Sequence, residues 1–249
     1  PSLYADELAT KARAILRSRE LRVLPVVDKH KHLIGMISRG DIMTITSSIS
    51  PIRVKGMMSL PKFIATEEMD VIKAAREMIR IDEWYTPVVK SSQDYTYLGM
   101  LGLENLIDAF LKKGFAKLAK PLSEIMSTEP VTCSPDDDVD NVWRLMQKHS
   151  FTGLPVVKKS KLVGIVTQKN LLDGGVVFPM FEAKKGRFKA PSKISSVMRT
   201  SVISLKLTSP VKEAATLMLE KNIGRVPIID GKGRLIGVID REDIVKALL

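Results

Sequence analysis

Hydrophobic and polar positions follow one pattern that occurs four times along this chain. Each copy has a Pro, two β-branched residues, a polar stretch of variable length, and an apolar run around a Gly. Six positions after that Gly comes an Asp or Asn. The glycines are Gly35, Gly99, Gly164 and Gly237, and the polar residues are Asp41, Asn105, Asn170 and Asp243. Such self-similarity predicts a chain built from equivalent structural units.

A second periodicity precedes each Pro. Apolar residues stand nine, thirteen and sixteen positions upstream, offsets that place them on one face of a helix. They are Leu16, Ala12 and Ala9; Met78, Ala74 and Val71; Met146, Val142 and Val139; and Met218, Ala214 and Val211. The Pro then begins an apolar strand, where its missing N–H is tolerated. Each unit is therefore predicted to run strand, helix, strand, loop, strand, helix, an α/β (α+β) arrangement in four βαββα repeats.

The boundaries of the units follow from these patterns. We expect repeats at 1–52, 53–111, 122–182 and 194–249, a linker at 112–121 and a connector at 183–193. A Met and a short extended run lead into the later three repeats, at Met58, Met126 and Met198. The first repeat lacks this lead-in and the chain starts at Pro1, so its first strand is expected to be missing. Units of about 60 residues are marginal alone, so the first should pair with the second and the third with the fourth.

Composition adds constraints on partners. The net charge is +11 and 45% of residues are hydrophobic, which favours anionic partners such as nucleotides, nucleic acid or an acidic protein. The one cysteine, Cys133, cannot form an internal disulfide and suits a reducing cytoplasm. No apolar run approaches the roughly 18 residues that span a bilayer, so we expect a cytoplasmic protein without membrane contact.

The fourfold pattern of Pro-Val-Val, Gly, hydroxyl and Asp resembles the cystathionine β-synthase (CBS) domain, here as two tandem pairs known as Bateman modules. The resemblance covers almost the whole chain. It implies a pseudo-symmetric fold with clefts between paired repeats, and a regulatory role in energy sensing: such modules bind AMP, ADP, ATP or S-adenosylmethionine and signal occupancy to a protein partner. A homodimer formed through the modules is also expected, and no cofactor is required.

Elementary chemistry agrees with part of this. A carboxylate at a helix start can accept from the two hydroxyls of a ribose diol, and helix N-terminal amides favour an anion nearby. Ser38 and Asp41 make the first repeat the complete match. The fourth has Asp243 but carries Asp240 where a hydroxyl is usual, and that charge should repel a phosphate. The second repeat, with Gly102 and Asn105, is expected to be empty or weak.

The candidate site residues fall into three groups. Ribose acceptors are Asp41, Asp243 and Asn170. Phosphate or polar contacts are Ser38, Arg39, Thr167, Asp240, Arg241, Arg22 and Arg225. Residues lining the clefts are Met36, Val238, Thr128, Thr152, Thr200 and Tyr85. On the family's geometry, Asp41 faces Trp84 and Tyr85, Asp243 faces Thr128, Phe151 and Thr152, and Asn170 faces Thr200 and Arg225.

Plainer interpretations remain open. Asp and Asn are excellent helix N-caps without any ligand, and Arg22 or Arg225 could be surface residues whose stems cover apolar neighbours. S-adenosylmethionine or methylthioadenosine could be the ligand, since neither presents a phosphate to Asp240. A nucleic-acid-binding scaffold would instead use the basic surface. His30 and His32 lack a third ligand nearby in sequence, so we expect no metal site. No catalytic arrangement or Gly-rich phosphate loop is present, so we expect no enzyme.

Overall fold

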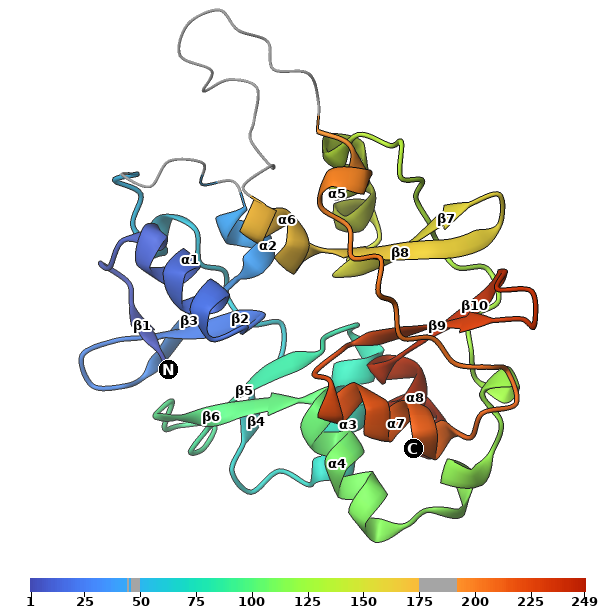
Figure 1. Ribbon diagram of the computed structural model, residues 1–249. Helices are drawn as coiled ribbons and strands as arrows, with labels where there is room; N and C mark the ends of the chain where they lie inside the picture. Colours follow the sequence, from blue (N-terminus) through green and yellow to red (C-terminus); the bar gives the residue numbers. More distant parts are fainter. Residues whose placement is uncertain (44, 46–49, 175–191) are drawn as a thin grey trace, which may run out of the picture.

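The computed structural model describes residues 1–43, 45, 50–174 and 192–249. The chain forms four units that surround a common centre (Figure 1). The first comprises β1 (Leu3–Tyr4), α1 (Ala9–Ser18), β2 (Val23–Val27), β3 (Leu33–Ser38) and α2 (Arg39–Ile42). The second comprises β4 (Ala65–Thr66), α3 (Val71–Arg80), β5 (Tyr85–Val89), β6 (Tyr97–Gly102) and α4 (Leu103–Lys113).

The second half of the chain repeats this order. The third unit has α5 (Val139–Lys148), β7 (Gly153–Lys158), β8 (Lys161–Thr167) and α6 (Gln168–Gly174). The fourth has α7 (Val211–Glu220), β9 (Arg225–Ile229), β10 (Leu235–Asp240) and α8 (Arg241–Leu248). Short 3₁₀ turns occur at η1 (Val54–Gly56), η2 (Ala116–Ala119), η3 (Leu122–Glu124) and η5 (Ile194–Ser196). The predicted α/β order is confirmed, while the expected repeat end at 182 and most of the 183–193 connector lie outside the described residues.

The first strand of the first repeat is present, so the expectation that it is missing was wrong. Leu3 and Tyr4 pair in parallel with Val26 and Val27, and Leu3 is fully buried. Its two residues are too short to show a periodicity in sequence. In the later half, the opening strand shrinks to single parallel bridges, one between Cys133 and Val156 and one between Leu205 and Ile228.

The predicted helix faces bury as expected, with one exception. Leu16, Met78, Met146 and Met218 are all fully buried. Val71, in contrast, is 41% exposed, although the equivalent first helical residues of the other repeats, Ala9, Val139 and Val211, are buried. Cys133 is a small buried side chain, as predicted, and burial raises the pKa of its thiol to about 12.

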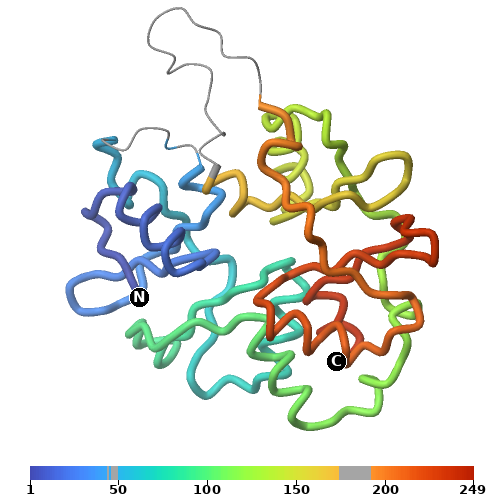
Figure 2. Tube along the Cα trace, viewed as in Figure 1, coloured from blue at the N-terminus to red at the C-terminus, as the bar shows by residue number. Residues whose placement is uncertain are grey.

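Paired repeats meet through backbone bridges, which confirms the predicted pairing. The first and second repeats are joined at His32 with Thr96 and at Met36 with Ser59. The third and fourth are joined at Ile165 with Arg199 and at Ser127 with Val238. Figure 2 shows the first pair, blue to green, on one side of the molecule and the second pair, yellow-green to red, on the other.

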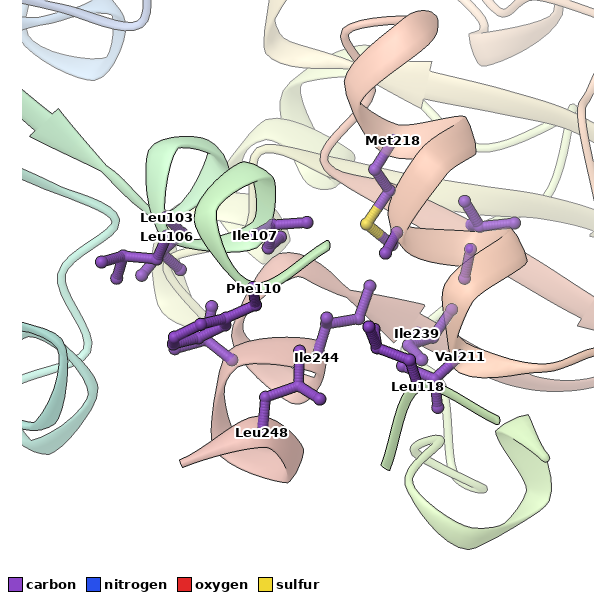
Figure 3. Close-up of a cluster of buried hydrophobic side chains, with 14 of the residues drawn as sticks. Leu103, Leu106, Ile107, Phe110, Leu118, Val211, Met218, Ile239, Ile244 and Leu248 are labelled. Atoms are coloured by element: carbon purple, nitrogen blue, oxygen red, sulfur yellow. The ribbon is translucent and has the colours of Figure 1, made fainter. Parts of the chain in front are cut away.

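Helices hold the two pairs together. The largest core cluster combines α4 of the second repeat with α7 and α8 of the fourth. Figure 3 shows Phe110 of α4 near Ile244 and Leu248 of α8, and all three belong to this cluster. On the opposite side, α1 of the first repeat contacts α6 of the third, where Arg17 pairs with Asp173 at 3.0 Å. The four repeats therefore enclose a centre to which each contributes.

Candidate functional site

In each repeat, the Asp or Asn that follows the strand Gly by six residues lies in the first turn of a helix. Its side-chain oxygen accepts a hydrogen bond from the backbone N–H of the residue just before that helix. Asp41 Oδ2 accepts from the Ser38 backbone N–H and from Ser38 Oγ, both at 2.7 Å. Asn170 Oδ1 does the same with Thr167 N and Oγ1, at 3.0 and 2.8 Å. Asp243 Oδ2 accepts from Asp240 N at 2.9 Å. The capping interpretation is thus correct for all three side chains.

A cavity of about 470 Å³ lies where the four repeats meet. This volume falls within the range of small-molecule sites. Of the predicted site residues, the following line it: Arg22, Met36, Ser38, Arg39, Asp41, Tyr85, Thr152, Arg225 and Asp240. Trp84 and Phe151 line the same space. The structure therefore brings Asp41 together with Trp84 and Tyr85, which lie more than forty positions away in sequence.

Two arginines of the first repeat bring unmatched positive charge to this cavity. Arg22 Nη1 and Arg39 Nε are buried and lack a hydrogen-bond partner among the described residues. Neither side chain forms an ion pair within that part of the chain. The Arg22 guanidinium lies over the Trp84 ring, 5.2 Å from its centroid, an arrangement that attracts the cation only modestly. Burial lowers the pKa of both guanidinium groups, which is the expected sign for a cation held away from water.

Two arginines of the fourth repeat are, in contrast, matched by carboxylates of the protein. Arg225 Nη2 pairs with Asp240 Oδ2 at 3.0 Å, and its Nη1 donates to the Gly153 carbonyl at 2.8 Å. Arg241, 1% exposed, pairs with Glu104 Oε2 at 2.9 Å. The unmatched charge in the cavity is therefore concentrated on the first repeat.

Glu104 also occupies the place where the second repeat would have a hydroxyl. A Cβ added at Gly102 would lie 2.7 Å from the Glu104 carboxylate. This carboxylate reaches Arg241 of the fourth repeat, whose Nη1 is also 3.3 Å from Tyr85 Oη. The expectation of an empty or weak second site thus has a physical basis, since a protein carboxylate fills it.

A smaller cavity of about 220 Å³ lies beside Asp243. Predicted residues on its lining are Val238, Asp240, Asp243 and Arg225, and Phe151 lies there too. Burial, followed by the neighbouring Asp240 charge, raises the pKa of Asp243 to about 7. The Asp243 carboxyl, one of those that line this cavity, therefore titrates near neutral pH.

The comparisons with known proteins agree with this architecture. Residues 1–47, 122–175 and 194–249 match the model of the CBS domain, more than half of the chain. The chain belongs to the CBS domain family. The second CBS repeat lies outside the matched segments, and it is the one in which Gly102 and Asn105 replace the hydroxyl and the Asp.

One relative covers the whole arrangement. Protein MJ1225 of Methanocaldococcus jannaschii is 23% identical over 98% of this chain and 94% of its own length. Its crystal structure, described as that of a candidate archaeal homologue of γ-AMPK, superposes with a TM-score of 0.88 at 20% identity, covering 100% of this chain and 96% of that one. The fold of four CBS repeats is therefore shared.

Other relatives share one pair of repeats. Inosine-5′-monophosphate dehydrogenase of M. jannaschii is 34% identical over 51% of this chain, which spans about a quarter of the enzyme's length (23%). The CBS-domain pair of MJ0100 was solved with 5′-methylthioadenosine and S-adenosyl-L-methionine. It is 27% identical and covers 51% of this chain at a TM-score of 0.42, and those ligands are a property of that protein.

Several predicted residues lie away from the two cavities. Thr128, Asn170, Thr167, Thr200 and Arg241 are absent from both linings. Asn170 and Thr167 bond to each other, and Arg241 is committed to Glu104 and Asn222. The pairing of Asn170 with Thr200 and Arg225 is therefore not seen at either cavity, and Arg241 does not face the central one.

Sequence reasoning missed other residues of the central cavity. His149, Gln168 and Lys62 line it, and the His149 ring stacks on Phe151 with centroids 5.4 Å apart. Glu104, which forms the ion pair with Arg241, was also missed. A signal existed for Glu104, since a carboxylate two positions after a Gly at the hydroxyl position can take the place of a bound anion.

Within the described ranges, no group of three or more His, Cys, Asp or Glu side chains could hold a metal ion. None of the helices described here is both long and apolar enough to cross a membrane.

Proposed function

We propose that this protein is a non-catalytic sensor that binds an adenine nucleotide, AMP, ADP or ATP, in the central cavity. Asp41 accepts from the ribose hydroxyls, Ser38 lies beside the phosphate, and Arg22 and Arg39 neutralise it. The observation that supports this most is that Arg22 and Arg39, on the same cavity as Asp41, have buried unpartnered nitrogens and no carboxylate partner among the described residues. Arg225 also has a buried unpartnered nitrogen, but its guanidinium pairs with Asp240. Unpaired buried cations are costly, and an incoming phosphate would satisfy them.

The distribution of charge favours the first repeat over the others as the nucleotide site. Arg225 and Arg241 already have Asp240 and Glu104 as partners. A phosphate near them would have to displace a carboxylate of the protein. Among the described residues no carboxylate forms an ion pair with Arg22 or Arg39, so the affinity for phosphate should be highest there.

Binding in this cavity could be transmitted because its walls come from all four repeats. The Arg22 guanidinium lies against Gly224 of the fourth repeat, where an added Cβ would be 2.7 Å from Arg22 Nη2. A phosphate that draws Arg22 toward itself changes this contact between the two pairs. Nucleotide binding shifts the protein between two packings of the repeat pairs only if these packings differ in nucleotide affinity. A regulated protein partner would respond to that shift.

Calorimetry with AMP and adenosine on the same protein tests the proposal. Wild type should bind AMP more tightly than adenosine, because only AMP reaches the arginines. Arg22→Met should lower AMP affinity about 10- to 100-fold, the effect of one lost charged hydrogen bond, and leave adenosine affinity unchanged. Arg80→Met is a matched control, since Arg80 is exposed on α3 and pairs only with Glu77 among the described residues. Absence of heat with AMP, ADP and ATP at millimolar ligand would rule out the proposal.

A further inference from the structure

The hairpin loops of the third and fourth repeats carry a concentration of exposed positive charge. One loop joins β7 to β8 and the other joins β9 to β10, and both lie at one edge of the molecule, on the right in Figure 1. A backbone hydrogen bond of 3.0 Å from Leu235 N–H to the Ser160 carbonyl holds the loops together. Their cations are Lys158, Lys159, Lys161, Lys232 and Arg234. We call these five residues the basic loop surface.

The basic loop surface has little negative charge to balance it. Asp230 is the acidic residue of the two loops, and it pairs with Arg234 at 2.6 Å. The four lysines are exposed and form no ion pair among the described residues. Their ammonium groups are therefore available to an anion from outside the chain.

The equivalent loops of the first and second repeats are closer to balance. They carry three lysines and two acids, which are Lys29, Lys31, Lys90, Asp28 and Asp94. One of these lysines is neutralised, since Lys90 Nζ lies 3.3 Å from Asp94 Oδ2. The excess positive charge thus distinguishes one pair of repeats from the other, although the hairpins occupy the same place in each repeat.

The lysines stand where they are unfavourable for the fold itself. Lys158 lies opposite Lys161 across the hairpin, and Lys161 lies opposite Arg234. Like charges directly opposite each other on neighbouring strands destabilise a sheet. The two central residues of the first loop, Lys159 and Ser160, have φ of 49° and 63°, and loops of that kind favour Asn and Gly. A segment that costs stability in two ways points to a function that uses its charge.

The chemistry of this surface favours an acidic polypeptide over a nucleic acid. Neither loop contains an aromatic residue on which a base could stack, and the guanidinium of Arg234 is held by Asp230. Stacking and bidentate arginine contacts are common means of nucleic-acid recognition. What remains is a set of flexible point charges on strands about 5 Å apart. Acidic side chains on one face of an extended peptide recur about every 7 Å, so they can reach several of these lysines.

We propose that the basic loop surface is a docking site for an acidic, extended segment of a partner polypeptide. The site does not depend on which ligand the central cavity binds. It is nevertheless connected to that cavity, because β8 and β10 run from the loops to Thr167 and Asp240. Asp240 and Gln168, the residue after β8, line the cavity. A partner docked here would contact the outer ends of strands whose inner ends reach the cavity.

Binding of a labelled 20-residue peptide of alternating Glu and Ser, followed by fluorescence anisotropy, tests the proposal. Wild type should bind the peptide at about 50 mM salt and lose affinity as salt screens the charges. The combined variant Lys158→Gln, Lys161→Gln and Lys232→Gln should lose about 10-fold or more in affinity. It should melt no lower than wild type, because the opposed like charges are gone.

The matched control is the combined variant Lys29→Gln, Lys31→Gln and Lys90→Gln in the equivalent loops of the first pair. It lowers the net charge by the same amount and should change peptide affinity less than about 2-fold. Equal losses in the two variants would show that the peptide responds only to overall charge, and no binding to wild type would also overturn the proposal. A 20-base-pair DNA duplex is the competing probe. If it binds more tightly than the peptide and is lost in the first variant, the partner is a nucleic acid and the assignment to a polypeptide is wrong.

Discussion

At the scale of single residues, the matching of buried charges distinguishes the four repeats. Arg22, Arg39, Arg225 and Arg241 all come close to the centre, but carboxylates of the protein partner only the last two. A buried cation without a partner destabilises the ligand-free fold, while removing one member of a matched pair leaves the other uncompensated. Substitutions at the two kinds of arginine should therefore have opposite effects on stability.

Arg22→Met and Arg241→Met provide that comparison, with similar length and no charge in either variant. Arg22→Met should leave the free energy of unfolding unchanged or raise it by up to about 1 kcal/mol, because a desolvated charge is removed. Arg241→Met should lower it by about 2 kcal/mol, because Glu104, Tyr85 and Asn222 lose a charged donor. Urea unfolding of the ligand-free proteins measures both. Equal losses in the two variants would contradict the distinction between matched and unmatched arginines.

Asp243 links stability to pH. Its pKa in the folded protein is about 7, raised by burial and by Asp240, so the folded state holds a proton that the unfolded chain releases near pH 4. The folded state therefore binds more protons between about pH 4 and 7, and stability falls as pH rises through that window. Asp82 acts in the same direction, because burial and a hydrogen bond with Glu242 raise its pKa to about 6.

The corresponding measurement is the melting temperature of wild type and Asp243→Asn from pH 5 to pH 8. Wild type should lose stability as pH rises, and the variant should lose less because Asn does not titrate. Asp230→Asn is a useful control, since Asp230 has a lowered pKa from the Arg234 hydrogen bonds and titrates below this range. Parallel pH profiles for wild type and Asp243→Asn would exclude this role of Asp243.

At the scale of elements, the lead-in Met of one repeat packs against the strand Gly of the repeat paired with it. A Cβ at Gly35, Gly164 or Gly237 would lie 3.1, 2.9 or 2.8 Å from the sulfur of Met58, Met198 or Met126, respectively. The backbone carbonyl after each Met is equally close, as with Arg199 O at 3.0 Å from Gly164. The partner repeat is what contacts these three glycines.

Gly164→Ala should destabilise the protein by about 1–3 kcal/mol, the usual effect of adding a methyl group to a tightly packed position. Gly99→Ala is the matched control at the equivalent strand position of the second repeat, where nothing lies within 4 Å of the added Cβ. Its effect should stay within about 0.5 kcal/mol. Thermal unfolding of both variants makes the comparison. An equal loss of stability in Gly99→Ala would show that strand propensity, rather than the contact with the paired repeat, causes the destabilisation.

The elements themselves could be predicted from sequence because their signals are local. The Pro-Val-Val runs, the helix offsets and the fixed spacing from Gly to Asp each lie within one repeat, and each corresponds to an observed element. The partners of the charged residues are not local: Arg241 meets Glu104 across 137 positions, and Arg225 donates to Gly153 across 72. The sequence does not indicate whether such an arginine faces a carboxylate or a cavity, so Arg22 and Arg241 were grouped together although the structure separates them.

At the scale of the whole molecule, the second and fourth repeats share one hydrophobic core. Leu103, Leu106, Ile107 and Phe110 of α4 pack with residues of α7 and α8, and all are almost completely buried (Figure 3). Neither repeat can lose this contact without exposing apolar surface of the other. The cooperative unit therefore joins repeats of different pairs, although backbone bridges join repeats within a pair.

Ile107→Ala tests this coupling between the pairs. Ile107 is fully buried, so its truncation should lower the free energy of unfolding by about 2–5 kcal/mol. Leu98→Ala, at a 47% exposed position in β6 of the same repeat, should have little effect. Native-state hydrogen exchange locates the consequence: amides of α7 and α8 should lose protection together with those of α4, while those of α1 change less. If α8 retained full protection while the second repeat opened, the two repeats would be independent units, and a ligand in the central cavity would lack this core as a route for coupling one pair to the other.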